Sequence, residues 1–267
     1  NLIVGHSGIL SITHAAFYGL GAYATAILTK FYGVPFFSSM IIGVFVSIVV
    51  ASLISYSLKK VKGDYYALAS IGLAVIMYSL FMNLDGITKG PLGIFGITRP
   101  SLFGITFSTS ISFLFLTVVI AGFSSIVIDR LARTHFGRVL HAIREDEDAL
   151  VPFRYHINDY KMAVFVIGAI FASISGSLYA SYISFIDPSS FTLNGSIFLL
   201  TVIILGGLAS TRGVIAGVVV LTLLPEVLRF IGLPNEIASQ TRVILYGLAL
   251  IYLMYKRPVG LFGKYSL

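Results

Sequence analysis

The stretch that decides the fold is Phe31–Leu58, which reads FYGVPFFSSMIIGVFVSIVVASLISYSL and contains no Asp, Glu, Lys or Arg. An α-helix needs about 20 apolar residues to cross the hydrocarbon core of a bilayer. A charged side chain at mid-membrane costs about 2.5–3.5 kcal/mol on insertion scales. A charge-free run of this length therefore predicts a transmembrane helix.

Charge-free apolar runs recur along the whole chain. Two of them, at the C-terminal end, reach spanning length only by including charged or polar neighbours, so Glu226, Arg229 and Arg242 are expected near one interface. The sequence predicts an all-α fold, a polytopic bundle of about eight membrane segments within a single domain, residues 1–267. Ser196–Thr211 is the segment expected to be broken or re-entrant. The runs are Asn1–Thr29, Phe31–Leu58, Tyr65–Leu84, Ser101–Ile128, Met162–Ile186, Pro188–Thr211, Gly213–Pro225 and Val243–Tyr255.

The composition agrees with this class. Of 267 residues, 57% are hydrophobic and 11% are charged, against about 25% charged in soluble domains. This excludes a soluble enzyme, a disordered chain and a coiled coil. The chain has no Cys, which excludes disulfides and thiolate metal sites. Residue 1 is Asn rather than Met, and the sequence leaves open whether residues precede it; no cleavable signal peptide is evident.

The net charge of +7 fits a membrane orientation and not nucleic-acid binding. If the N-terminus is cytoplasmic and each run crosses once, the inner loops are 58–64, 129–161, 209–213 and 256–267. These loops carry most of the cations, as the positive-inside rule requires, and both termini are then cytoplasmic. The outer cations are Lys30, Lys89, Arg99, Arg229 and Arg242. The inner cations are Lys59, Lys60, Lys62, Arg130, Arg133, Arg138, Arg144, Arg154, Lys161, Arg212, Lys256, Arg257 and Lys264.

Small residues at helical spacing predict where helices pack. Gly168, Ala172, Gly176 and Ala180 fall every four residues, and Gly213 and Gly217 repeat the spacing. Small side chains let helix backbones approach where lipid supplies no hydrophobic drive. We therefore expect packing seams at these residues.

The sequence predicts no catalytic or metal site in this chain. Its five histidines form no H-E-x-x-H pair, and Gly206–Gly213 has Arg-Gly where a phosphate-binding loop needs Lys-Ser/Thr. The long apolar runs also lack the ionisable groups of an ion-coupled carrier, since Asp85, Asp187 and Glu226 fall near predicted span ends. If the protein moves a solute uphill, we expect the energy to enter through another subunit.

The longest inner loop, 129–161, is where such a subunit could dock. Val139, Leu140, Ile143 and Leu150 can share one side of a short helix, which Pro152 is expected to end. One interpretation is a solvated connector. The other is a docking helix, whose apolar side fills a groove of the partner while mixed charges set the register.

Six blocks of the chain, in order, resemble the branched-chain amino acid ABC-transporter permeases of the LivM type. The resemblance covers about residues 5 to 260. Its most specific block is FGRVLHAIREDE, residues 136–147. The others are Thr13–Tyr23, Lys62–Leu68, Lys89–Ile94, Tyr179–Pro188 and Leu205–Ser210.

The resemblance implies an inner-membrane permease subunit of an ABC importer. It implies as partners a second permease of the LivH type, two cytoplasmic ATPases that hold ATP and Mg, and an extracytoplasmic substrate-binding protein. This chain would bind no cofactor itself. The segment 136–150 would be the coupling helix within the cytoplasmic loop 129–161. The coupling residues implied are Phe136, Gly137, Arg138, Leu140, Ala142, Ile143, Arg144, Glu145, Asp146 and Glu147.

The chain departs from the family's pattern after this block, where Arg154 and His156 replace the usual Gly and Asn. We expect this departure to alter the fine fit to the ATPase and to leave the coupling segment itself in place.

Candidate groups for a translocation path come from the first block and from the Gly pair near residue 206. Broken helices expose backbone groups that can meet the charges of an amino acid. For His14 a packed histidine, hydrogen-bonded to a neighbouring helix, is the competing interpretation. The candidates are His14, Phe17, Gly19, Gly21, Gly206 and Gly207.

Three alternatives to this function stay open at this point. An ion-coupled secondary carrier or a passive channel would transport alone. A membrane scaffold would bind ATPases and move nothing. A permease of the same family could carry urea or another small polar solute.

Overall fold

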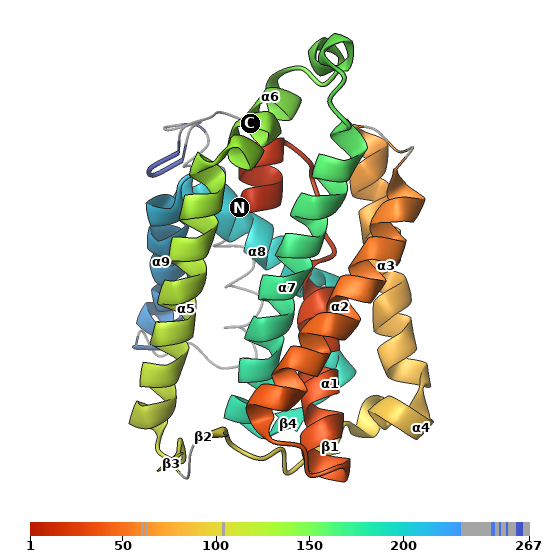
Figure 1. Ribbon diagram of the computed structural model, residues 1–267. Coiled ribbons are helices and arrows are strands. Elements are labelled where there is room, and N and C mark those ends of the chain that lie inside the picture. Colours follow the sequence, from red (N-terminus) through yellow and green to blue (C-terminus); the bar gives the residue numbers. More distant parts are fainter. Residues whose placement is uncertain are drawn as a thin grey trace.

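The computed structural model describes residues 1–59, 61, 63–102, 105–230, 247–248, 251, 255 and 260–263. The fold is all-α, as predicted: a bundle of long helices with short strands at one end (Figure 1). The elements are η1 (Leu2–His6, a π-helical turn), α1 (His14–Phe31), α2 (Phe36–Leu58), α3 (Asp64–Asn83), α4 (Asp85–Thr88), η2 (Gly90–Leu92), β1 (Ile94–Phe95), β2 (Ser101–Leu102), β3 (Ile105–Thr106), α5 (Ser110–Arg133), α6 (His135–Glu145), η3 (Asp148–Phe153), α7 (Ile157–Ile183), β4 (Phe185–Ile186), η4 (Pro188–Phe191), α8 (Leu193–Gly206) and α9 (Thr211–Phe230).

Among the described residues, four helices are long and apolar enough to cross a membrane. These are Phe36–Leu58, Tyr65–Asn83, Ser110–Arg133 and Ile157–Ile183, which correspond to α2, α3, α5 and α7. The predicted count of about eight segments is not confirmed. The run Val243–Tyr255 and the cations Lys60, Lys62, Arg242, Lys256, Arg257 and Lys264 lie largely or wholly outside the described residues.

Two of the charge-free runs do not form single spanning helices. The run from residue 1 to 29 is interrupted: η1 ends at His6, and α1 begins only at His14. The run from 188 to 211 contains a 3₁₀ turn and the 14-residue helix α8. At 1.5 Å per residue such a helix is about 21 Å long, shorter than the hydrocarbon core of about 30 Å.

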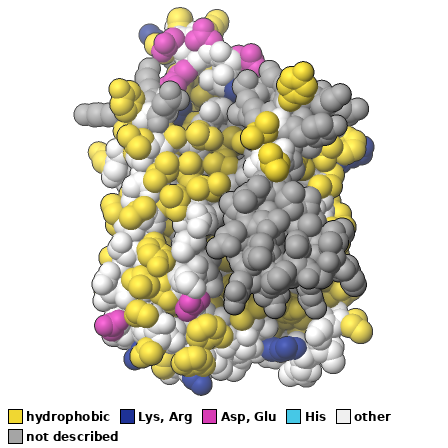
Figure 2. All heavy atoms as spheres, turned by 180° about the vertical axis from the view of Figure 1, so that it is seen from behind, with side chains coloured by type: hydrophobic (Ala, Val, Ile, Leu, Met, Phe, Trp, Pro, Cys, Tyr) yellow, Lys and Arg dark blue, Asp and Glu magenta, His cyan; other side chains and the backbone are white. Residues whose placement is uncertain are grey.

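The two ends of the bundle differ in structure. One end, which we call the α6 end, carries α6, η3 and the turn between α2 and α3 (Figure 1). The other, the β end, carries α4 and the antiparallel pairs β1–β4 and β2–β3. Figure 2 shows hydrophobic side chains over the middle of the visible face, with Lys, Arg, Asp and Glu towards the ends. This distribution suits a protein whose middle lies in lipid.

The centre of the bundle is formed by α1, α2 and α7, which pack through small side chains. On α2 the buried side is a row of small residues, and α7 and α1 meet so closely that a Cβ on Gly176 would overlap the carbonyl oxygen of Tyr18. Across this seam the hydroxyl of Thr25 donates to that of Ser177 at 2.8 Å. The row on α2 is Ser39, Gly43, Ser47, Ala51 and Ser55.

The second predicted seam joins α8 to α9. Gly213 and Gly217 of α9 lie against Gly206 of α8, and a Cβ on either glycine would crowd the backbone of α8. Gly207, with φ of 111°, turns the chain between the two helices. The predicted spacing therefore marks a true close approach here.

Candidate functional site

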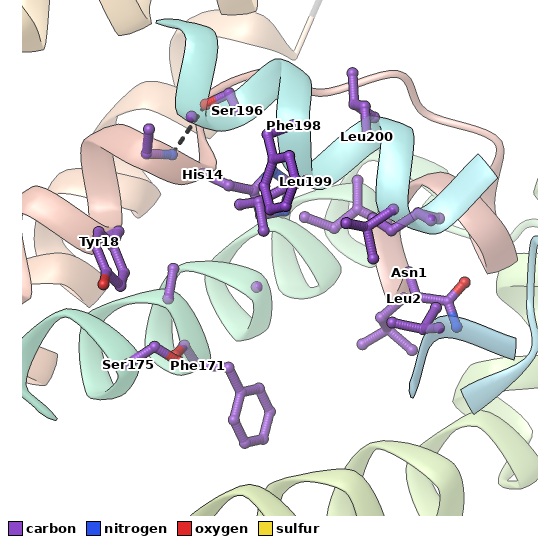
Figure 3. A pocket seen from close by; sticks show the side chains of 18 of the residues that line it. Asn1, Leu2, His14, Tyr18, Phe171, Ser175, Ser196, Phe198, Leu199 and Leu200 are labelled. Carbon is purple, nitrogen blue, oxygen red and sulfur yellow. Dashed lines mark hydrogen bonds between the residues drawn. The ribbon is translucent and has the colours of Figure 1, made fainter. Parts of the chain in front are cut away.

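A cavity of about 540 Å³ lies beside the break in the first helical stretch. Residues of η1, α1, α7, α8 and α9 line it, and its walls are mostly apolar. Figure 3 shows His14, Tyr18, Ser175 and Ser196 around it, with Phe171, Leu199 and Leu200 on its other sides. We call it the central cavity.

A second cavity, of about 710 Å³, adjoins the first between α5 and α7. The two share Tyr18, Ile128, Phe171 and Ser175. The second is also lined by Ser110 and Tyr182, which lie where α5 begins and α7 ends, at the β end. The two cavities therefore adjoin each other, and the second extends towards the β end.

One hydrogen bond joins the two interrupted segments at the cavity wall. The backbone N–H of Ala15, at the start of α1, donates to the hydroxyl of Ser196 in α8 at 3.0 Å (Figure 3). Ser196 is 1% exposed. Ala15 is 5% exposed, so both partners are buried and this bond ties the start of α1 to α8.

Replacing Ser196 by Ala is expected to lower the free energy of unfolding by about 1–2 kcal/mol, because the Ala15 N–H loses its partner. The measurement is thermal unfolding of the protein in detergent. Ser57→Ala is the matched control, since the Ser57 hydroxyl is exposed and donates to the Leu53 carbonyl of its own helix. Equal effects of the two substitutions would contradict this role.

The structure brings only one of the six predicted path residues to the central cavity, namely His14. Phe17 packs edge to face on Phe165, with ring centroids 5.4 Å apart. Gly19 lies against Phe81 and Phe191, and Gly21 against the backbone of Ser173. Gly206 and Gly207 lie in the seam and turn between α8 and α9.

The predicted packing seam of α7 is divided between two surroundings. Gly176 and Ala180 are buried, and Gly176 faces α1. Gly168 and Ala172 line the central cavity. Gly176 and Ala180 therefore serve helix packing, as expected. Gly168 and Ala172 instead leave one wall of the central cavity without large side chains.

The predicted coupling segment forms the short helix α6 across one end of the bundle (Figure 1). Its apolar side faces inward: Val139, Leu140 and Ile143 belong to the protein's own core, and Leu140 is 0% exposed. The expectation that this apolar side fills a partner's groove is therefore wrong. The bundle itself covers it.

The end of this helix also differs from the prediction. α6 ends at Glu145, where Asp146 adopts extended backbone angles. The carboxylate of Asp146 accepts the N–H groups of Asp148 and Ala149 and so starts the 3₁₀ segment η3. Pro152 lies inside η3, so it does not end α6.

An ion pair, a ring contact and a close backbone approach fix α6 and its surroundings. The carboxylate of Glu147 pairs with the ammonium of Lys161 at 2.6 Å, and Phe136 stacks on Tyr160. Gly137 lies so close to the carbonyl of Ala132 that a Cβ would overlap it. Of the remaining predicted coupling residues, Arg138, Glu145 and Asp146 are exposed and Ala142 is half-buried. The surface left for a partner is therefore polar.

A direct link runs from α6 to the first helical turn of the chain. The guanidinium of Arg144 donates to the backbone carbonyl of Gly5. The rings of His6 and His141 lie 4.8 Å apart between the same two elements. Since Leu2 and Ile3 of η1 line the central cavity, α6 is joined to the cavity wall through η1.

The sequence did not single out Tyr18, Ser175, Ser190 or Ser196 as cavity residues. Tyr18 lies within a block that resembles the family, but nothing in its spacing distinguishes it from its neighbours. The serines carry no sequence signal, because hydroxyl groups serve equally in helix packing. Within the described part of the chain, no group of three or more His, Asp or Glu could hold a metal ion.

Comparison with known proteins gives a consistent result. The family described as "Branched-chain amino acid transport system / permease component" matches residues 1–254. No solved structure matches the chain significantly.

Curated relatives bear related names. The chain is 33% identical to "High-affinity branched-chain amino acid transport system permease protein LivM" of Salmonella typhimurium and 32% identical to the protein of that name from Escherichia coli. Both matches cover 98% of this chain, which spans 65% of the length of either relative. It is 26% identical to "Probable branched-chain amino acid transport permease protein LivM" of Methanocaldococcus jannaschii, over 95% of this chain and 80% of the relative.

Proposed function

The chain belongs to the family of permease components of branched-chain amino acid transport systems, and from this premise we propose that it is the membrane-spanning subunit of an ATP-driven ABC importer. Its substrates are branched-chain or related amino acids. It works beside a second permease of the LivH type, two cytoplasmic ATPases and an extracytoplasmic binding protein, in the cell (inner) membrane. ATP is hydrolysed by the ATPases and not by this chain.

One observation carries this proposal: a polar-surfaced helix at the bundle end is joined through η1 to the central cavity. In the mechanism we propose, the ATPases hold the exposed side of α6. Their closure on ATP shifts α6 and η1 together. The small-residue seams let α1, α7 and α8 rock, so that the cavity changes the end to which it opens.

The test is uptake of leucine into proteoliposomes that contain both permeases and both ATPases, with the binding protein outside. We expect uptake only with ATP on the ATPase side. Uptake by this chain alone, driven by an ion gradient, would instead indicate a secondary carrier. ATPase binding without any flux would indicate a scaffold.

The proposal also fixes the orientation, with the α6 end in the cytoplasm. The chain has no Cys, so single cysteines can report the side on which they lie. Ser108→Cys at the β end is expected to react with a membrane-impermeant maleimide in intact cells. Thr134→Cys beside α6 is expected to react only after permeabilisation. Both residues are exposed, and the reverse pattern would invert the orientation.

A further inference from the structure

We propose that the central cavity is itself a substrate site, which binds a zwitterionic amino acid with an aliphatic side chain. This inference rests on the proposed function and adds to it a selective site within the permease. The cavity volume of about 540 Å³ lies within the usual range for small-molecule sites, about 300–1,000 Å³.

The walls favour an aliphatic side chain and disfavour a net charge. Ile3, Phe171, Leu199, Ile203 and Val214 supply apolar surface. Among the described residues that line the cavity there is no Asp, Glu, Lys or Arg side chain. Burying a net charge against such walls is costly, whereas a zwitterion carries two charges that cancel and an apolar tail that fits.

The polar edge of the cavity offers an acceptor on one side. The hydroxyl of Tyr179 donates to Ser190 Oγ at 3.3 Å, and Ser190 Oγ donates to a carboxylate oxygen of Asp187 at 2.9 Å. Ser190 has one hydroxyl proton, and this proton is used in the hydrogen bond to Asp187. Ser190 lines the cavity, and its hydroxyl oxygen has a second lone pair that can accept a further hydrogen bond, which suits an ammonium group.

A donor lies close by. The ring of Tyr18 lies 5.4 Å from that of Tyr179, and Tyr18 lines both cavities. Its hydroxyl makes no hydrogen bond with any residue in the part of the chain that the structure describes. It can donate to a carboxylate, so the edge matches the two charged groups of an amino acid with opposite hydrogen-bonding roles.

The experiment measures binding of radiolabelled leucine to the complete transporter in nanodiscs, without the binding protein and without ATP. Tyr18→Phe keeps the ring and removes the donor, and it is expected to weaken leucine binding about tenfold. Ala172→Leu fills the cavity from α7 and is expected to weaken it by a similar factor. Lysine and glutamate are expected to compete at least about tenfold less well than leucine.

Two control substitutions lie away from the cavity. Tyr56→Phe makes the same chemical change at an exposed residue of α2. Gly122→Leu adds the same side chain on α5 where nothing lies within 4 Å. Both are expected to leave leucine binding unchanged.

Three results would overturn the site: leucine binding that both cavity variants leave intact, lysine or glutamate competing as well as leucine, or no binding to a transporter that still takes up leucine. Each would leave the proposed function standing. The proposed function fails on a different result, namely the absence of ATP-driven uptake by the unmodified transporter. In that case the binding assay still shows whether the central cavity binds leucine.

Discussion

Replacing Gly176 by Val is expected to lower the free energy of unfolding by about 3 kcal/mol, because the added side chain forces α7 away from α1. A Cβ at this position would overlap the carbonyl oxygen of Tyr18 and crowd the backbone N of Ala22. The neighbouring atoms belong to a helix backbone and cannot turn aside. We expect a lower yield of monodisperse protein and a lower unfolding temperature in detergent.

Gly72→Val is the matched control for this prediction. Gly72 lies in α3, and nothing lies within 4 Å of a Cβ built on it. The same substitution there is expected to leave the unfolding temperature close to that of the unmodified protein. An equally stable Gly176→Val protein would mean that α1 and α7 do not pack as closely as the structure shows.

The same helix shows how far residue spacing predicts packing. The sequence places Gly168, Ala172, Gly176 and Ala180 on one line, and the structure divides them between the cavity and α1. A helix turns once every 3.6 residues, so a row of every fourth residue drifts by about 40° at each step. Over three steps the row winds about 120° around the helix and reaches a different neighbour.

The break before α1 illustrates a second limit. Absence of charge correctly marks the first stretch as apolar, but it says nothing of continuity. In the structure the chain turns at Gly8, with φ of 69°, and the N–H of Ile12 donates to the hydroxyl of Ser70 in α3 at 3.0 Å. A partner 58 residues away makes this non-helical backbone tolerable inside the bundle, and no local pattern records it.

The sequence predicts correctly that α6 has an apolar side, but the expectation that a partner covers that side is wrong. Helical spacing shows that Val139, Leu140 and Ile143 share a side. It does not show whether the residues that pack on this apolar side belong to this chain or to another. The long α5 and α7 place α6 across the bundle end, and the core around Phe165 and Ile157 takes its apolar side.

Replacing Arg144 by Gln is expected to reduce leucine uptake per ATP hydrolysed by at least about tenfold in the reconstituted transporter. Gln is too short to keep the bond from the Arg144 guanidinium to the Gly5 carbonyl. With that bond lost, a movement of α6 is transmitted less completely to η1 and to the cavity wall. ATP hydrolysis is expected to continue, because Arg144 is half-buried against the bundle and the exposed side of α6 stays intact.

Arg138→Gln separates this effect from a general loss of positive charge on α6. Arg138 lies on the same helix but is exposed, and among the described residues its guanidinium bonds to the carbonyl of Arg133, at 3.5 Å. Weaker binding of the ATPases to α6 would lower uptake and hydrolysis together, so Arg138→Gln is expected to keep the ratio of uptake to hydrolysis. If both variants keep that ratio, the link through η1 does not transmit the movement. If both lose it, the polar surface of α6 matters more than the Gly5 contact, because Arg138 shares that surface and has no contact with η1.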